Sequence, residues 1–204
     1  MYYKIDVFLE ECSKEDLRND DKQYVAILTS EEWKKQRESF NMGIDLDTTT
    51  MEILSSQAEV NYDSLTGTFV IPNRKDLSDG TRKFAFALDE KGIVLIDDTG
   101  YVNDVVSIFK RTKKWRFPSL ERFIYDFLDQ IIKFDPRLLE NYENELDKTE
   151  RAIIDNTLAE DSTRVNEIRG DLRDLRKHYG QLMEVVEIFK ENENSFFKID
   201  NLRY

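Results

Sequence analysis

The chain has 204 residues, and 40% of them are hydrophobic, which is enough apolar material for one large domain or for one domain with a helical appendage. The net charge of −12 excludes a surface made mainly to bind nucleic acid or an anionic membrane, because such partners would repel the chain on average. One cysteine and one histidine exclude a disulfide framework and any multi-cysteine or histidine-rich metal site. We expect Cys12 to be a small, partly buried thiol and His178 to lie on the surface or rim of a helix.

No stretch of the sequence approaches the length of about 18 consecutive apolar residues that a membrane-spanning helix needs. The first residues lack the basic and apolar regions of a signal peptide. We therefore expect this chain to be soluble and intracellular.

The first hundred residues alternate between strand and helix signals. Alternating or continuous apolar segments predict six strands. These segments cover residues 2–9, 23–28, 58–62, 66–71, 83–88 and 92–96. The pair Lys91-Gly92 predicts a tight hairpin between the last two strands. Hairpins combined with helical crossovers predict a mixed sheet rather than an all-parallel one.

Three helices are predicted in the same half. Thr29, followed three residues later by Glu32, forms a capping-box pattern that predicts a helix over residues 30–40. Apolar spacing predicts a shorter helix over residues 48–55 and a further one over residues 102–110.

The second half of the sequence is dominated by long helical patterns. Ser119 is a good helix start, and Pro136 should kink or divide the helix that follows it, because proline lacks an amide donor and clashes with the preceding turn. We expect helices near residues 119–156 and 160–192. The second of these carries a heptad seam of apolar residues. Its members are Val165, Ile168, Leu172, Leu175, Tyr179, Leu182, Val186 and Phe189. The short connector predicts that the seam packs antiparallel against the arm containing residues 138–153.

The sequence contains no catalytic motif. The sequence has no phosphate-binding glycine loop and no nucleophile with a base partner, so we expect that the protein is not an enzyme. A short basic cluster consists of Lys113, Lys114 and Arg116 around Trp115. Because this cluster is too small to outweigh the acidic charge, we interpret it as a connector or a contact between domains.

Carboxylates are the only abundant functional groups. Asp45 and Asp47 with Glu52, and Asp97 with Asp98, could each bind a hard divalent cation through oxygen ligands. Neither spacing resembles an EF-hand loop, and capping or surface roles are the simpler explanation for each group taken alone.

The order of elements and two helical motifs point to a family. The first arm carries Glu-Leu-Asp-Lys-Thr-Glu at residues 145–150, and the second carries Leu-Arg-Asp-Leu-Arg-Lys at residues 172–177. With these motifs the chain resembles the N-terminal cytosolic domain of the CorA-like divalent metal cation (Mg²⁺) transporters. The resemblance implies an α/β fold: an α/β/α domain with a mixed sheet over residues 1–118, then a long antiparallel helical hairpin over residues 119–204. Residues 200–204 resemble the opening of the family's stalk helix.

The resemblance also implies a function. The chain would be the cytosolic, ion-sensing regulatory domain of a magnesium channel or transporter, on the cytoplasmic side of the cell membrane. It lacks the family's two membrane helices and its Gly-Met-Asn signature. The full-length protein would be a homo-oligomer, a pentamer, with Mg²⁺ as the regulatory and transported ion.

By position, Glu52 matches the family's domain-side metal ligand, with Asp47 as a substitute. The partner acid would lie on the stalk of a neighbouring subunit, so this chain would hold a half-site that binds Mg²⁺ weakly or not at all. Two alternatives stay open: a soluble α/β and helical-hairpin module that binds partner proteins, and a zinc-transporting member of the same family.

Overall fold

The computed structural model describes residues 1–18, 22–42, 53–74, 77, 80–154 and 162–198. A seven-stranded sheet forms its centre, in the order β2-β1-β3-β7-β6-β5-β4. The strands are β1 (Tyr2–Ile5), β2 (Leu9–Cys12), β3 (Tyr24–Leu28), β4 (Gln57–Val60), β5 (Leu65–Pro72), β6 (Thr81–Leu88) and β7 (Gly92–Ile96). Strands β3 and β7 pair in parallel and the other neighbours pair antiparallel, which confirms the predicted mixed sheet.

The prediction of one continuous strand over residues 2–9 is wrong. The chain reverses at Asp6 and returns as a separate strand, so that β1 and β2 form an antiparallel hairpin. The carboxylate of Asp6 accepts the Val7 amide at 2.6 Å, and the Asp6 amide donates to the Phe8 carbonyl at 3.1 Å. Aspartate commonly stabilises turns through such local hydrogen bonds, and this was the available signal for the reversal.

Five α-helices and two short 3₁₀-helices complete the described elements. They are η1 (Glu15–Arg18), α1 (Ser30–Gln36), η2 (Arg37–Ser39), α2 (Tyr101–Thr112), α3 (Leu120–Ile132), α4 (Asp135–Ile154) and α5 (Ser162–Glu191). The capping box of α1 is confirmed: the Thr29 hydroxyl accepts the Glu32 amide, and the Glu32 carboxylate accepts the Thr29 amide. Most of the predicted helix over residues 48–55 lies outside the described residues, and residues 53–55 are not helical.

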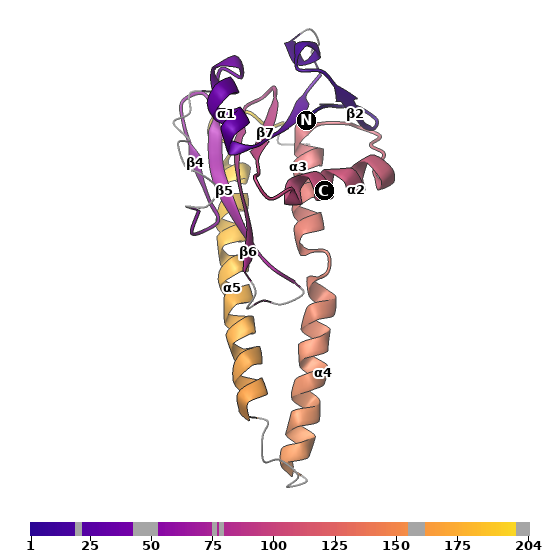
Figure 1. The fold of residues 1–204 in the computed structure, drawn as a ribbon, viewed down its shortest axis with the longest axis vertical. Helices are drawn as coiled ribbons and strands as arrows, with labels where there is room; N and C mark the ends of the chain where they lie inside the picture. The colour runs from indigo at the N-terminus through magenta and orange to yellow at the C-terminus, as the bar shows by residue number, and fades with distance from the viewer. Residues whose placement is uncertain (19–21, 43–52, 75–76, 78–79, 155–161, 199–204) are drawn as a thin grey trace.

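Pro136 divides the helices of the second half, as predicted. Helix α3 ends at Ile132 and α4 begins at Asp135, so the proline lies in the first turn of α4, where a missing amide donor costs no hydrogen bond. Helices α4 and α5 run antiparallel and extend well away from the sheet (Figure 1). With 30 residues, α5 is about 45 Å long at about 1.5 Å per residue.

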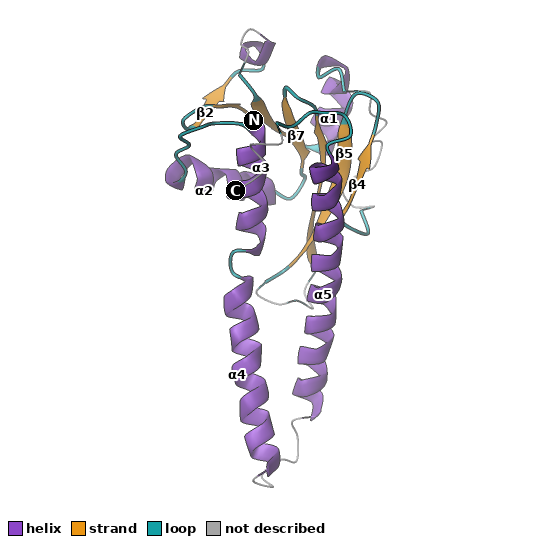
Figure 2. Cartoon of the chain, turned by 180° about the vertical axis from the view of Figure 1, so that it is seen from behind, coloured by secondary structure: helices purple, strands orange, loops and turns teal. Residues whose placement is uncertain are grey.

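The sheet is covered on both faces, which gives three α/β/α layers. Figures 1 and 2, which view the chain from opposite sides, show α1 and α5 on opposite faces of the sheet. One face packs against α2, α3 and the C-terminal half of α5, and this larger core contains Phe84, Phe86 and Phe123. The other face packs against α1 and contains Trp33 and Phe40.

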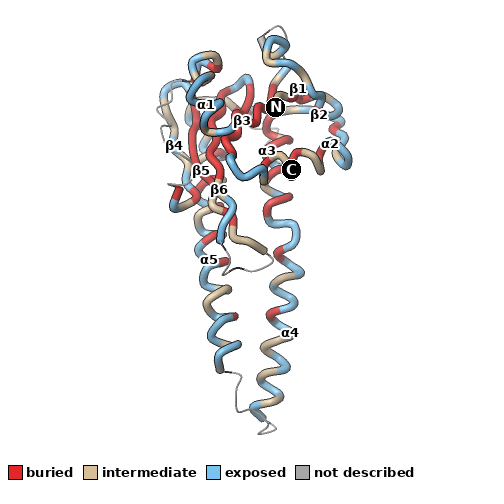
Figure 3. Tube along the Cα trace, in the orientation of Figure 1, coloured by how far each residue is buried: buried red, intermediate tan, exposed pale blue. Residues whose placement is uncertain are grey.

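Helix α5 has two different partners along its length. Near its start, Ile168 and Leu175 form a small cluster with Tyr142 of α4. Towards its end, Val185 and Phe189 join the larger core under the sheet. Figure 3 shows the contrast, with burial concentrated around the sheet and mostly exposed residues at the far end of α4 and α5.

The prediction that the whole seam packs against the first arm is therefore wrong in its second half. Beyond Leu175 the buried positions are His178, Leu182, Val185 and Phe189, whereas the predicted Val186 is only half-buried. The buried face rotates because a sheet, rather than a single helix, covers this part of α5. We call residues 135–154 with 162–177 the hairpin arm, and the sheet with the remaining helices the α/β region.

Candidate functional site

The acids predicted as metal ligands do not form a described metal centre. Asp45, Asp47 and Glu52 lie outside the described residues. Asp97 and Asp98 lie within them, and both cap helices. Among the residues that the structure describes, no group of three or more His, Cys, Asp or Glu side chains is placed to hold a metal ion.

Asp97 is buried at the end of β7 and serves the start of α2. Its carboxylate accepts the Thr99 amide and hydroxyl, each at 2.7 Å, and the Val102 amide at 2.8 Å. Asp98 accepts the Ser30 amide at 2.8 Å and the Ser30 hydroxyl at 2.6 Å, at the start of α1. Both acids therefore accept hydrogen bonds from residues at the start of a helix. This is the capping role that the sequence analysis gives as the simpler explanation.

A buried ion pair joins the hairpin arm to the sheet. Asp135, at the first position of α4, is 3% exposed. Arg74, just after β5, donates from Nε and Nη2 to the two carboxylate oxygens of Asp135, at 2.5 and 2.8 Å. Tyr179 of α5 donates its hydroxyl to the same carboxylate at 2.8 Å. One carboxylate thus connects α4, α5 and the end of β5, and both of its oxygens accept hydrogen bonds.

His178 lies beside this ion pair, and the expectation of a surface or rim position is wrong. The residue is 3% exposed, and neither ring nitrogen has a hydrogen-bond partner of normal geometry among the described residues. Burial lowers its pKa to about 4, and the positive charge of Arg74 acts in the same direction, against the opposing effects of Asp135 and the Val70 backbone. The imidazole is therefore neutral at physiological pH.

Two tyrosines complete the polar contacts of the arm. Burial and the hydrogen bond to Asp135 raise the pKa of Tyr179 to about 12. Tyr142 of α4 donates to Asp171 of α5 at 2.7 Å, and burial with this bond raises its pKa as well. Both phenols remain protonated donors, so these contacts position helices and do not transfer protons.

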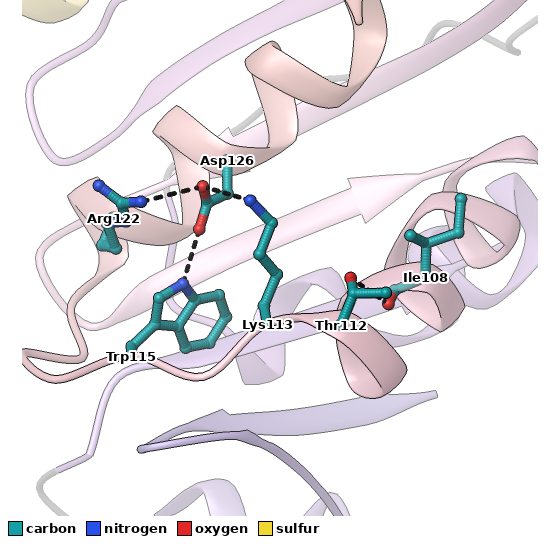
Figure 4. A network of polar contacts seen from close by, with 6 residues as sticks. All are labelled: Ile108, Thr112, Lys113, Trp115, Arg122 and Asp126. Atoms are coloured by element: carbon teal, nitrogen blue, oxygen red, sulfur yellow. Dashed lines mark hydrogen bonds and ion pairs between the residues drawn. The ribbon is translucent and has the colours of Figure 1, made fainter.

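The basic cluster forms a contact between the α2–α3 connector and α3 (Figure 4). Asp126, 1% exposed, accepts the Lys113 ammonium at 2.8 Å and the Trp115 indole N–H at 2.7 Å. Arg122 adds a longer bond of 3.3 Å to the same carboxylate. The figure also shows that the Thr112 hydroxyl bonds to the Ile108 carbonyl at the end of α2. This agrees with the interpretation of the cluster as a connector.

Cys12 is half-buried, and burial raises the pKa of its thiol.

The segment that follows α5 is anchored to the α/β region. Glu121 of α3, also buried, accepts the Lys198 amide through Oε1 at 2.8 Å. The Asn192 side chain accepts the Phe197 amide at 2.9 Å and donates to the Phe197 carbonyl at 2.7 Å. The Phe197 ring is buried in the larger core. Sequence reasoning missed this anchor, because its partners are 77 residues apart and form no periodic pattern.

These contacts define the chemistry of the candidate site. Asp97, Asp126 and Asp135 accept hydrogen bonds from donors of their own chain, and each joins one structural element to another. Such an arrangement holds helices in position against the rest of the fold.

Comparison with known proteins identifies related folds. A family model described as "CorA-like Mg2+ transporter protein" matches residues 25–204. No curated protein sequence matches the chain.

Three solved structures share the fold. The soluble domain of CorA from Methanocaldococcus jannaschii has a TM-score of 0.68 and 17% identity, over 99% of this chain and 84% of that one. The complete CorA magnesium transporter of the same organism has a TM-score of 0.71 and 14% identity, over 98% of this chain and 65% of that one. The full-length CmaX protein has a TM-score of 0.70 and 11% identity, over 100% of this chain and 66% of that one. The chain thus spans slightly less than two thirds of the two full-length structures.

Proposed function

Because the chain belongs to the family of CorA-like Mg²⁺ transporter proteins, we propose that it is the cytosolic, ion-sensing regulatory domain of a magnesium channel or transporter. The family match over residues 25–204 carries this proposal. The α/β/α region with its long helical hairpin supports it, because the same fold occurs in the soluble domain of an archaeal CorA.

None of the helices in the described part of the chain is both long and apolar enough to cross a membrane. We assign conduction to other parts of the protein and sensing to this chain. The chain spans 65% of the complete CorA structure. We propose the transport activity for the whole protein and not for this chain alone.

The proposed sensing mechanism is thermodynamic linkage. A divalent cation that bridges carboxylates of neighbouring subunits stabilises one arrangement of a homo-oligomer, here proposed to be a pentamer. When the magnesium concentration falls, the bridge is lost and the subunits are free to move. We assign the domain-side carboxylate to Glu52, with Asp47 as the substitute, from the resemblance of the surrounding sequence to the family. Mg²⁺ keeps most of its waters and commonly uses only one or two carboxylates, which suits such a bridge.

Two described contacts provide a route for the movement. The pair of Arg74 and Asp135 connects the sheet to the hairpin arm. The bond from Lys198 to Glu121 connects the segment after α5 to the first turn of α3. In this proposal a displacement of the α/β region would move the hairpin arm and the chain that leaves α5, because the accepting carboxylates of Asp135 and Glu121 are buried.

The test is magnesium protection of the full-length protein against proteolysis. We expect Mg²⁺ to slow cleavage of the wild-type protein, and Glu52→Ala to remove this protection. Glu143→Ala is the matched control, because Glu143 is an exposed acid on α4 with no ion pair among the described residues. Unchanged protection in Glu52→Ala together with loss in Asp47→Ala would move the assignment to Asp47. Unchanged protection in both variants would contradict the proposed site.

Two further measurements separate the alternatives. Calorimetry of the 204-residue chain should give Mg²⁺ binding no tighter than about millimolar, because an open half-site with one carboxylate holds a hydrated ion poorly. Micromolar binding would contradict the half-site. Protection of the full-length protein by Zn²⁺ but not Mg²⁺ would identify a zinc-transporting member. Recovery of the full-length protein outside the membrane fraction would favour a soluble interaction module.

A further inference from the structure

A surface cavity of about 580 Å³ lies on the α/β region, away from the hairpin arm. It forms where η1, the start of β3, η2 and the β6–β7 turn meet. Its walls include Lys14, Lys22, Tyr24, Phe40, Asn41 and Lys91. The volume falls within the range of about 300–1,000 Å³ that is typical of small-molecule sites.

The described walls of the cavity are mainly basic. Among the described residues, three lysines and one acid, Glu90, contribute to the walls, although the chain as a whole carries −12. Lys22 pairs with Asp6. The ammonium groups of Lys14 and Lys91 form no ion pair with any described residue, and Lys14 lies 5.9 Å from the centre of the Phe40 ring. Unpaired cations around a concave surface favour an anionic ligand.

An aromatic wall lies next to these cations. The rings of Tyr24 and Phe40 pack with their centres 6.1 Å apart. Tyr24 keeps its place because its neighbour on β7 is Gly92: a Cβ there would lie 2.5 Å from the Tyr24 carbonyl oxygen and 2.7 Å from its ring. Burial, together with the charges of Asp89 and Glu90, raises the pKa of Tyr24, so the phenol remains a hydrogen-bond donor.

We propose that this cavity binds a phosphorylated small molecule with a flat ring, of the mononucleotide class. The phosphate would be held by Lys14 and Lys91, which requires Lys14 to move away from the Phe40 ring. The ring of the ligand would then pack against the small exposed part of Phe40, which is 9% exposed. Lysine ammonium groups bind phosphate through charge-assisted hydrogen bonds. The cavity is too large for a free phosphate ion to fill. This site is independent of the proposed magnesium sensing and uses none of its residues.

Calorimetry with the 204-residue chain tests the proposal, using AMP, adenosine and inorganic phosphate as probes in the absence of magnesium. AMP should bind more tightly than either adenosine or phosphate. Lys14→Gln and Lys91→Gln should each weaken AMP binding about tenfold, because each removes one charge-assisted contact. Lys34→Gln is the matched control, because Lys34 is an exposed lysine on α1 outside the cavity, and it should leave binding unchanged. Circular dichroism checks that all three variants remain folded.

The outcomes are distinguishable. Equal affinity for AMP and phosphate would show that the ring makes no contact, and would overturn the nucleotide assignment. Equal losses in Lys34→Gln and the cavity variants would show diffuse attraction to surface lysines, and would overturn the site. Absence of AMP binding would also overturn it, while leaving the magnesium-protection test of the full-length protein unaffected.

Discussion

The α/β region and the hairpin arm are stabilised very differently. In the α/β region both faces of the sheet are covered, and side chains such as Phe84, Phe86 and Val94 are completely buried. In the hairpin arm only Tyr142, Ile168 and Leu175 form a buried apolar cluster. The arm therefore depends on its attachment at the base, whereas the α/β region is a self-sufficient core.

The attachment itself is polar. Arg74 and Asp135 form a buried ion pair at the point where the arm leaves the sheet, with Tyr179 as a third partner. Buried ion pairs add little net stability over apolar contacts, but removal of one partner leaves an uncompensated charge. The pair consequently suits a joint that must hold one orientation. The comparison predicts large effects in the core, intermediate effects at the joint and smaller ones in the arm.

The largest effect is expected in the core. Phe86 packs against Phe69 and Phe189 with ring centres 5.3 and 5.7 Å apart. Phe86→Ala should lower the free energy of unfolding by about 3–5 kcal/mol, because it removes buried surface and leaves a cavity. Urea unfolding followed by tryptophan fluorescence measures this loss. The control Phe134→Ala, at an exposed site, should change stability by less than about 0.5 kcal/mol; equal losses would contradict the assignment of the core.

The second-largest effect is expected at the joint formed by the ion pair of Arg74 and Asp135. Arg74→Ala leaves the Asp135 carboxylate buried without its guanidinium partner and should cost about 3 kcal/mol in unfolding free energy. Adding Asp135→Asn should recover part of this loss, because the unpaired charge is then gone. Arg137→Ala, two residues after Asp135 and exposed, is the control. A double variant no more stable than Arg74→Ala would show that the buried charge is not the cause.

In the hairpin arm, two neighbouring seam positions should behave differently. Leu175 is 1% exposed, whereas Leu172 is only half-buried. Leu175→Ala should cost about 2–3 kcal/mol and Leu172→Ala about 1 kcal/mol, in proportion to the surface each buries. Thermal unfolding by circular dichroism compares them. Equal costs would support the uniform heptad seam and contradict the partial burial seen here.

An effect smaller than that of Leu175→Ala concerns pH. The pKa of His178 is about 4 in the folded chain, against 6.5 for a free histidine side chain as in the unfolded chain. Between pH 4 and pH 6.5 the unfolded chain therefore binds more protons than the folded chain. Stability should therefore fall as the pH decreases from about 7 to 4, and His178 should account for about 2 kcal/mol of the loss at pH 5. His178→Phe should lose this part of the pH dependence. Parallel stability curves for the variant and the wild type would indicate that His178 has the same pKa in the folded and unfolded chains, and would contradict this prediction.

Much of the fold could be predicted from local patterns. The Thr29–Glu32 capping box, the helix start at Ser119 and the division at Pro136 each depend on atoms within one turn of the chain. The candidate site was less predictable. The bonds of Arg74 to Asp135 and of Lys198 to Glu121 span 61 and 77 residues, and no spacing in the sequence signals them.

The sequence by itself determined the order and type of most elements, because helix caps, proline breaks and apolar periodicity act through neighbouring residues. It also determined that the sheet is mixed, through the hairpin at Gly92. Only the tertiary structure decided which face of α5 is buried beyond Leu175, and hence that His178 lies inside. The physical reason is that a heptad pattern specifies an apolar stripe but not its partner: a second helix covers the start of α5, and the sheet covers its end.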